Sequence, residues 1–322
     1  MFAEEARLKI FLYAAILLTL LGYTGRYLGL EPLHSQFFAF AAWAYVFFAD
    51  NLAYRFSGAS PAVSRPAEFL LLALWSLALS CVAELFNLRL GVWHYVDQPS
   101  ALGVRWAGFV FAWAALLPSV FVTSELLASL GLLRGLRSGP LRVTQPLLRN
   151  SFAVGALLLL LALAAPGPLW PLACAAFFLL AEPLNYRLGL PSLLREWQGG
   201  LPARTLRLAL AGSICGLLWT AWNGAAGAQR VFSAALPGPR VLDLPLAAYA
   251  LFPLLALQAY ALCGLASALR GGRNWEEHSW DMPSAVPSLR YRLAVPLLLA
   301  AAVYLSLRAV DARTVKVFLG WV

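Results

Sequence analysis

Charged residues are scarce in this chain of 322 residues: they make up 12% of it, whereas hydrophobic residues make up 61%. A soluble domain carries roughly 25% charged and about 45–50% apolar residues. The mean hydropathy of +0.73 agrees with this imbalance. The composition therefore excludes an ordinary soluble enzyme and a disordered chain, and it predicts a polytopic membrane protein.

Lysine and cysteine are also rare. Lys9 and Lys316 are the two lysines, so arginines in short groups between apolar runs carry most of the net charge of +9. Basic residues placed in this way are typical of cytoplasmic loops, and we expect no nucleic-acid partner. The four cysteines lie in apolar stretches without a CxxC spacing. They are expected to be small buried hydrophobic residues.

The sequence lacks the common motifs for cofactors and hydrolysis. It has no Walker A, GxSxG, HExxH or Rossmann pattern, which argues against an ATP-driven pump or a standard hydrolase. Glu277, His278 and Asp281 match no known metal spacing, and a haem held by His34 and His94 has no further support. We therefore expect no metal and no cofactor.

Nine apolar stretches approach the roughly 20 residues that a membrane-spanning helix needs. They show no alternation with a period of two, so the expected fold class is all-α rather than a barrel. Residues 166–168 (Pro-Gly-Pro) predict a tight turn between the fifth and sixth stretches. The expected spans are 8–25, 35–54, 68–90, 106–131, 152–166, 168–186, 205–224, 244–268 and 291–308.

The distribution of basic residues predicts the orientation. Sixteen of the 24 lie at the N-terminus or in the loops after even-numbered spans, and eight lie on the other side. Lys and Arg gather in cytoplasmic loops, so we expect a cytoplasmic N-terminus and an external C-terminus, in a bacterial inner membrane. The first apolar run follows two glutamates and lacks a small-residue cleavage site, so we interpret it as a retained span.

Two parts of the chain resemble each other. Residues 49–55 and 181–187 share Ala, an acid, Leu, Tyr and Arg in the same order, 132 positions apart. In the following spans, 84–87 and 220–223 share a final Asn, 136 positions apart. We interpret this as a duplication of four helices, with both copies entering the membrane in the same direction. The expected units are a first repeat (1–150), a degenerate second repeat (151–270), and a cytoplasmic loop with a ninth helix (271–322).

The first copy contains an acid within an expected span. Glu84 and Asn87 are three residues apart and share a helix face, and Trp93 and Tyr95 follow. An ionisable group within a membrane is costly and indicates a functional site. We predict Glu84 as the catalytic acid and Asn87 and Tyr95 as residues that orient it. Trp93 is expected to contact substrate, or else to belong to an interfacial aromatic belt.

The second copy lacks this set. Thr220, Gln229 and Val231 stand where the first copy has Glu, Trp and Tyr, and only Asn223 persists, as a candidate for substrate contact. The alternative is structural: the two asparagines hydrogen-bond between helices, while Glu84 pairs with a donor such as Arg89.

A second pair of candidates lies at helix ends expected on the cytoplasmic side. Asp50 precedes Arg55 by five residues, and Glu182 precedes Arg187 by the same spacing. One interpretation is a capping and ion-pair corner that holds the following loop. The other is a pair of binding sites for an anionic head group, in which arginine holds phosphate.

Part of the first copy resembles the small integral-membrane lycopene cyclase domains of bacteria and fungi. The residues that carry the resemblance are Glu84, Asn87, Trp93, Tyr95, Gly103 and Pro118. Those domains are duplicated helical modules with an acidic helix, a Trp-x-aromatic element and a Pro-x-Glu-Glu helix. The resemblance implies protonation of an isoprenoid double bond by a carboxylic acid.

The resemblance covers about 45 residues, and two features depart from the family pattern. Ser119 and Val120 follow Pro118, with no glutamate pair after it. The number of helices in a repeat also differs from that family, because four are expected here.

Three functions fit these observations. The first is a membrane-embedded enzyme that acts on an isoprenoid or another lipid through the Glu84 carboxyl. The second is a non-catalytic membrane subunit or lipid-binding scaffold with a protein partner, and the third is a transporter with its path between the two repeats. Few polar residues are expected near mid-membrane, Gln258 among them, which gives the transporter the least support.

Overall fold

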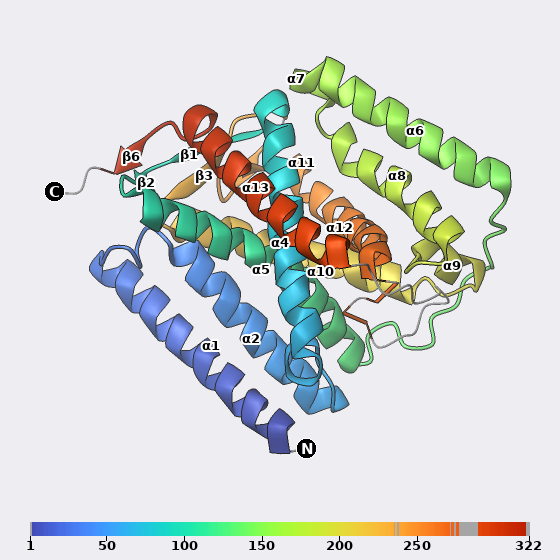
Figure 1. Cartoon of the computed structure of the whole chain (residues 1–322), viewed down its shortest axis with the longest axis horizontal. Helices are drawn as coiled ribbons and strands as arrows, with labels where there is room; N and C mark the ends of the chain where they lie inside the picture. Colours follow the sequence, from blue (N-terminus) through green and yellow to red (C-terminus); the bar gives the residue numbers. More distant parts are fainter. Residues whose placement is uncertain are drawn as a thin grey trace.

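The computed structural model describes residues 2–234, 236, 238–270, 272–273, 275–276 and 289–319. The described chain is mostly helical, as the apolar runs predicted, and its long helices pack side by side (Figure 1). Strands β1, β2, β3 and β6 gather on the side of the bundle away from the N-terminus.

Each of the nine expected spans overlaps a helix of 17 or more residues. The elements in chain order are α1 (Phe2–Leu28), α2 (Phe37–Ser57), α3 (Pro61–Ser64), α4 (Pro66–Leu90), β1 (Trp93–Val96), β2 (Gln98–Pro99), α5 (Leu102–Ser129), α6 (Gln145–Ala164), α7 (Pro166–Leu169), α8 (Leu172–Leu188), α9 (Leu193–Gln198), α10 (Ala203–Ala225), β3 (Gln229–Phe232), β4 (Arg240–Val241), β5 (Leu244–Pro245), α11 (Leu246–Tyr249), α12 (Leu251–Ser267), η1 (Ala268–Arg270), α13 (Leu289–Arg313) and β6 (Phe318–Leu319).

Seven stretches of the described chain are helical, long and apolar enough to cross a membrane. They are α1, α2, α4, α5, α6, α10 and the run from α11 to η1. A polytopic membrane protein is therefore confirmed. The spans expected in α8 and α13 remain predictions; α8 has 17 residues, fewer than the roughly 20 of a full crossing.

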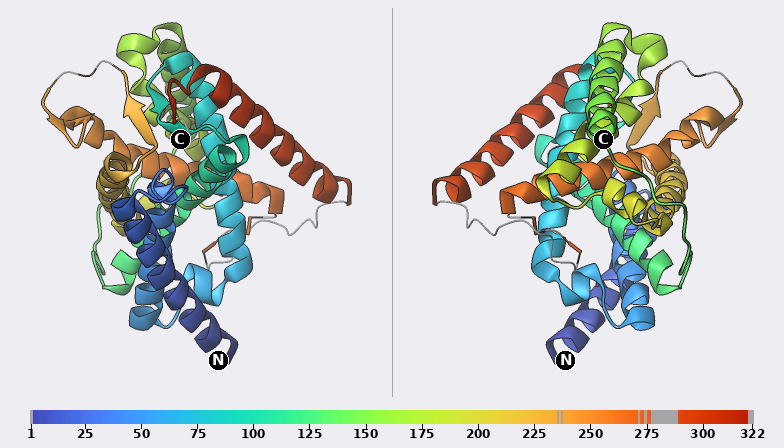
Figure 2. Two further views of the ribbon diagram at one scale, coloured as in Figure 1. Left: turned by 90° about the vertical axis from the view of Figure 1, so that its left-hand side faces the viewer. Right: turned by 90° about the vertical axis from the view of Figure 1, so that its right-hand side faces the viewer.

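The two halves use similar helix pairings. In the first half α1 packs on α2, α2 on α5, and α4 on α5; in the second, α6 packs on α8, α8 on α12, and α10 on α12. The halves meet where α10 packs against α5 and α2, and α13 lies across α4 (Figure 2). Glycine permits one close approach: a Cβ on Gly212 of α10 would lie 2.6 Å from the Phe252 carbonyl oxygen of α12.

Short strands add to the expected all-α architecture. β1 pairs with β3 in antiparallel register, and β2 pairs with β6 in parallel. The β1–β3 pair joins the segment after α4 to the segment after α10. The apolar pattern did not predict these strands, because the paired segments lie more than 130 residues apart in the sequence.

Asp50 caps the short helix α3. Its side chain is fully buried, and its carboxylate accepts hydrogen bonds from the Ser60 hydroxyl at 2.7 Å and the Ala62 amide at 2.9 Å. Ser60 is itself the N-cap of α3 and accepts a hydrogen bond from the Val63 amide. A carboxylate near a helix N-terminus is favoured by the helix dipole and satisfies amides that lack a helical partner.

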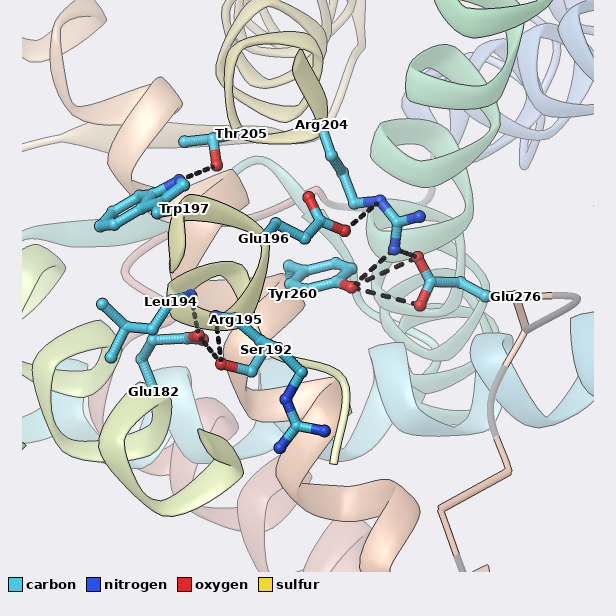
Figure 3. A network of polar contacts seen from close by, with 10 residues as sticks. All are labelled: Glu182, Ser192, Leu194, Arg195, Glu196, Trp197, Arg204, Thr205, Tyr260 and Glu276. Atoms are coloured by element: carbon cyan, nitrogen blue, oxygen red, sulfur yellow. Dashed lines mark hydrogen bonds and ion pairs between the residues drawn. The ribbon is translucent and has the colours of Figure 1, made fainter. Parts of the chain in front are cut away.

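Glu182 makes the same contacts in the second half. It accepts hydrogen bonds from the Ser192 hydroxyl at 2.6 Å and the Leu194 amide at 2.8 Å, and Ser192 caps α9 by accepting from the Arg195 amide (Figure 3). The acceptor, the serine and the capped amides stand at the same sequence spacing as in the first half.

These two acids give a stability prediction. Asp50→Asn and Glu182→Gln each keep one acceptor oxygen but remove the charge, and hydrogen bonds to charged groups contribute more than neutral ones. We expect each to lower the free energy of unfolding by about 1–2 kcal/mol, and by similar amounts because the contacts match. Unfolding in mixed detergent micelles measures both. A loss confined to one variant would contradict the matched roles.

The C-terminal helix is fastened to the first half by an ion pair. Arg105 of α5 binds Asp311 of α13 through two hydrogen bonds, of 2.8 and 3.0 Å, and the Trp106 indole donates to the same carboxylate at 2.7 Å. Just beyond α13, the Thr314 carbonyl accepts a hydrogen bond from the Tyr95 amide at 2.9 Å. The end of the chain therefore helps to hold β1 in place.

Candidate functional site

The residues predicted around Glu84 do lie together. Glu84, on α4, is 3% exposed. Its carboxylate accepts a hydrogen bond from the Tyr95 hydroxyl at 2.5 Å and from the Trp93 indole N–H at 3.1 and 3.2 Å. Because α4 ends at Leu90 and β1 turns back along it, the strand presents both aromatic donors to the acid.

Asn87 hydrogen-bonds to the backbone beside the donors of Glu84 rather than to the Glu84 carboxylate. Its carboxamide oxygen accepts from the amides of Val92 (2.9 Å) and Trp93 (3.2 Å), and its nitrogen donates to the Trp93 carbonyl at 2.9 Å. It therefore fixes the turn from α4 into β1, and with it the position of the Trp93 side chain. This is a local contact rather than the helix-to-helix hydrogen bond that the structural alternative expected.

Asn223 makes the corresponding contacts in the second half. Its carboxamide accepts from the Arg230 amide at 2.8 Å and donates to the Arg230 carbonyl at 2.9 Å. The Thr220 hydroxyl, three residues before Asn223 as Glu84 is before Asn87, donates to the Gly216 carbonyl of its own helix. Arg89, named as a possible donor to Glu84 in the structural alternative, instead donates to the Ala164 carbonyl at 3.5 Å.

Aromatic rings surround the acid and its donors. The rings of Tyr95 and Phe109 are 4.8 Å apart, and Phe109 stacks on Trp113 at 5.3 Å. Burial raises the pKa of Tyr95 well above its usual value, and the nearby Glu84 charge raises it further, while Arg230 opposes both. Tyr95 is therefore a neutral hydrogen-bond donor at physiological pH.

The arginines predicted as partners of the two capping acids lie elsewhere. Arg55 is exposed and forms no ion pair with Asp50, because that acid is buried against α3. Arg187 is also exposed and donates to the Gln145 side chain at 3.2 Å. The acids cap helices as the structural interpretation expected, but the ion-pair corner and the arginine–acid binding site are not assembled.

A second polar cluster lies at the start of α10. Arg204 forms an ion pair with Glu196 of α9 at 3.0 Å and another with Glu276 (Figure 3). Its guanidinium also donates to the Tyr260 hydroxyl at 3.0 Å, and that hydroxyl donates to the Glu276 carboxylate at 3.2 and 3.3 Å. We call these four residues the Arg204 network.

The Arg204 network joins segments that are distant in the sequence. Glu276 follows Trp275, whose buried ring stacks on Phe121 of α5 at 4.8 Å. Arg65, between α3 and α4, donates to the Trp275 carbonyl. Glu125 of α5 lies close enough to interact electrostatically with Arg204 and Glu276. The network therefore ties α5, α9, α10 and α12 together at one end of the bundle.

Glu196 predicts a pH dependence of stability. Burial raises its pKa to about 7 from an ordinary 4.5; Arg204 opposes the shift, but Glu276 shares that arginine and adds its own repulsion. Between these two pKa values the folded protein holds a proton that the unfolded chain releases. The stability that the folded protein gains by binding this proton is therefore fully present below the pKa of the unfolded chain. It is lost as the pH rises through about 7.

The variant Glu196→Gln tests that sign. We expect its stability relative to the wild type to improve as the pH rises from about 5 to about 8, because only the wild type loses this proton. Unfolding free energies at both pH values measure the difference. A difference that does not change with pH would contradict the assignment.

No group of three or more His, Cys, Asp or Glu side chains is placed to hold a metal ion within the part of the chain that the structure describes. Glu277, His278 and Asp281 lie outside the described residues.

Sequence reasoning missed Arg204, Glu196 and Tyr260 as partners. Arg204 and Arg207 at the start of an apolar helix were a usable signal, since an arginine facing a helix bundle needs an anionic partner. The identity of that partner was not readable, because α9 and α12 meet Arg204 only after folding.

The chain matches no protein-family model, no curated protein and no solved structure.

Proposed function

We propose that the protein is a membrane-embedded enzyme that acts on an isoprenoid or another lipid, with Glu84 as the proton donor. The observation that carries the proposal is the contact set of Glu84. This carboxyl is buried within a membrane-spanning helix, and among the described residues it is bound by two neutral aromatic donors and by no cation. An ionisable side chain within a membrane-spanning helix indicates a functional site by default. Unlike Asp50 and Glu182, which cap helices by binding backbone amides, Glu84 binds no backbone amide among the described residues.

The chemistry needs only a proton. The Glu84 carboxylic acid adds its proton to one carbon of a double bond; the π electrons form the new C–H bond, and the other carbon becomes a cation. The cation then loses a proton from an adjacent carbon, and the Glu84 carboxylate takes one back. The step is redox-neutral. Direct loss of the proton gives isomerisation; attack on the cation by a second double bond of the chain forms a C–C bond and a new cation, whose proton loss completes a cyclisation.

The surroundings suit this reaction. Aromatic faces such as those of Phe109 and Trp113 attract cations and would stabilise the charged intermediate. The hydroxyl of Tyr95 and the indole of Trp93 stabilise the carboxylate after it has given up its proton. Since Glu84 is almost completely covered, substrate reaches it only when the β1 side chains move aside.

Isotope incorporation tests the proposal. The purified protein is incubated in D₂O with isoprenoid lipids extracted from bacterial membranes, and the products are analysed by mass spectrometry. A product carrying deuterium at a former double-bond carbon is expected with the wild type and not with Glu84→Gln. Equal incorporation by both proteins would overturn the assignment of Glu84.

We also propose that the chain arose by duplication of four helices and sits in a bacterial inner membrane with its N-terminus in the cytoplasm. The matched caps at Asp50 and Glu182, the matched turns at Asn87 and Asn223, and the similar helix pairings support the duplication. The excess of basic residues in alternate loops supports the orientation. Membrane lipid is the expected partner.

A further inference from the structure

The β1–β3 pair presents residues from both halves of the chain on one face. Tyr95 is paired with Arg230, and Trp93 with Phe232. Residues directly opposite each other in an antiparallel pair point to the same face, as do residues two apart in a strand. The face that carries the two donors to Glu84 therefore also carries Arg230, from the second half of the chain.

Arg230 is held in place by two contacts. Its guanidinium lies over the ring of Trp93, 5.4 Å from the centroid, and Trp93 is the residue whose indole N–H donates to Glu84. Its backbone amide and carbonyl are both bound by the Asn223 carboxamide. The Asn223 contacts fix the backbone of Arg230, and the cation–π contact places its guanidinium beside the indole that donates to Glu84.

The guanidinium donors of Arg230 have no acceptor in the part of the chain that the structure describes. Arg230 is exposed, and no acceptor among the described residues receives a hydrogen bond from its side chain. Its positive charge acts on the Glu84 carboxyl, but no ion pair forms between them within the described residues. A guanidinium whose N–H groups bind no acceptor among the described residues can bind a phosphate through two parallel hydrogen bonds.

We propose that Arg230 binds a phosphate group on the lipid substrate, next to the acid Glu84. The inference rests on the proposed function and narrows its substrate class to lipids with an apolar chain and a phosphate head. The first repeat supplies the acid and its aromatic donors, and the second supplies the phosphate ligand. This division explains why the second copy keeps Asn223, which clamps Arg230, although it has lost the acid.

A matched pair of probes tests the proposal. Farnesyl phosphate and farnesol differ only in the phosphate, and the binding of each radiolabelled compound to the protein is measured in a neutral detergent. We expect the wild type to bind the phosphate at least about tenfold more tightly, since hydrogen bonds to charged groups contribute roughly 1.5–3 kcal/mol. Arg230→Gln should remove that preference and leave farnesol binding unchanged.

The control is Arg240→Gln, which removes an exposed arginine of β4 from the same loop region. It should leave farnesyl phosphate binding unchanged. Equal affinity for the two probes in the wild type, or equal losses in the two arginine variants, would overturn the proposal. Competition by phosphatidylglycerol but not by diacylglycerol would support a phosphate site whose natural occupant is a membrane phospholipid.

Different results would overturn the proposal on Glu84 and the proposal on Arg230. Glu84→Gln is expected to reduce turnover strongly while keeping the Arg230-dependent binding of farnesyl phosphate. Turnover that depends on Glu84, together with no preference for phosphate, would overturn only the inference on Arg230. A phosphate preference that depends on Arg230, with no deuterium incorporated into any lipid, would overturn only the enzyme.

Discussion

Glu84→Gln is expected to reduce turnover by about 10²–10⁴-fold, the usual contribution of a positioned general acid. The substitution keeps the size of the side chain, and its carboxamide oxygen still accepts a hydrogen bond from Tyr95 or Trp93. What it removes is the proton that the acid form donates. The measurement is the rate of product formation under saturating lipid, alongside the thermal unfolding midpoint.

Two further variants separate chemistry from folding. Glu84→Asp keeps a carboxylic acid on a side chain that is one methylene shorter. Its turnover should lie between those of the wild type and Glu84→Gln. Glu196→Gln makes the same chemical change in a partly buried carboxyl of the Arg204 network, and it should leave turnover unchanged. Full activity in the Glu84→Gln protein with an unchanged midpoint would show that the carboxyl is structural.

Arg204→Ala is expected to lower the free energy of unfolding by about 3–5 kcal/mol, the typical cost of breaking a buried ion pair by removing one partner. The side chain lies between two carboxylates, and their side chains are 17% and 4% exposed. Without the arginine, Glu196 and Glu276 face each other with no shared cation. Unfolding in mixed micelles at constant detergent composition measures the loss.

Arg204→Lys and a double variant make the interpretation specific. Lysine keeps the charge but offers a single ammonium in place of a planar guanidinium, so part of the stability should return. In Arg204→Ala combined with Glu276→Gln, the repulsion between the two carboxylates that contacted the arginine is removed, and the loss should be smaller than in Arg204→Ala alone. Equal losses in the single and double variants would contradict a direct Arg204–Glu276 contribution.

Residue spacing was a good guide where the partners are close in sequence. The Glu84, Trp93 and Tyr95 cluster forms because β1 follows α4 after a two-residue turn, and Asn87 fixes that turn. The caps at Asp50 and Glu182 are equally local, since each acid reaches a serine ten residues later. Short connections leave the chain few alternatives, so these contacts follow from the sequence order.

Spacing was a poor guide to the partners of arginine. Arg55 and Arg187 stood near acids in the sequence, yet both are exposed. Arg105 forms an ion pair with the distant Asp311, and Arg204 pairs with the distant Glu276 as well as with the nearby Glu196. A long arginine side chain pairs with whichever acid lies within its reach once the helices have packed. That choice depends on helix packing and cannot be read from neighbouring residues.

By itself, the sequence determined that this protein is a bundle of apolar helices, with acids at a few helix positions, because a low charge content and long apolar runs leave no other stable arrangement in a membrane. Only the tertiary structure decided that β1 pairs with β3, and so that Arg230 lies on the ring of Trp93 beside Glu84. The physical reason is that strand pairing joins backbone groups more than 130 residues apart. No local propensity encodes that contact.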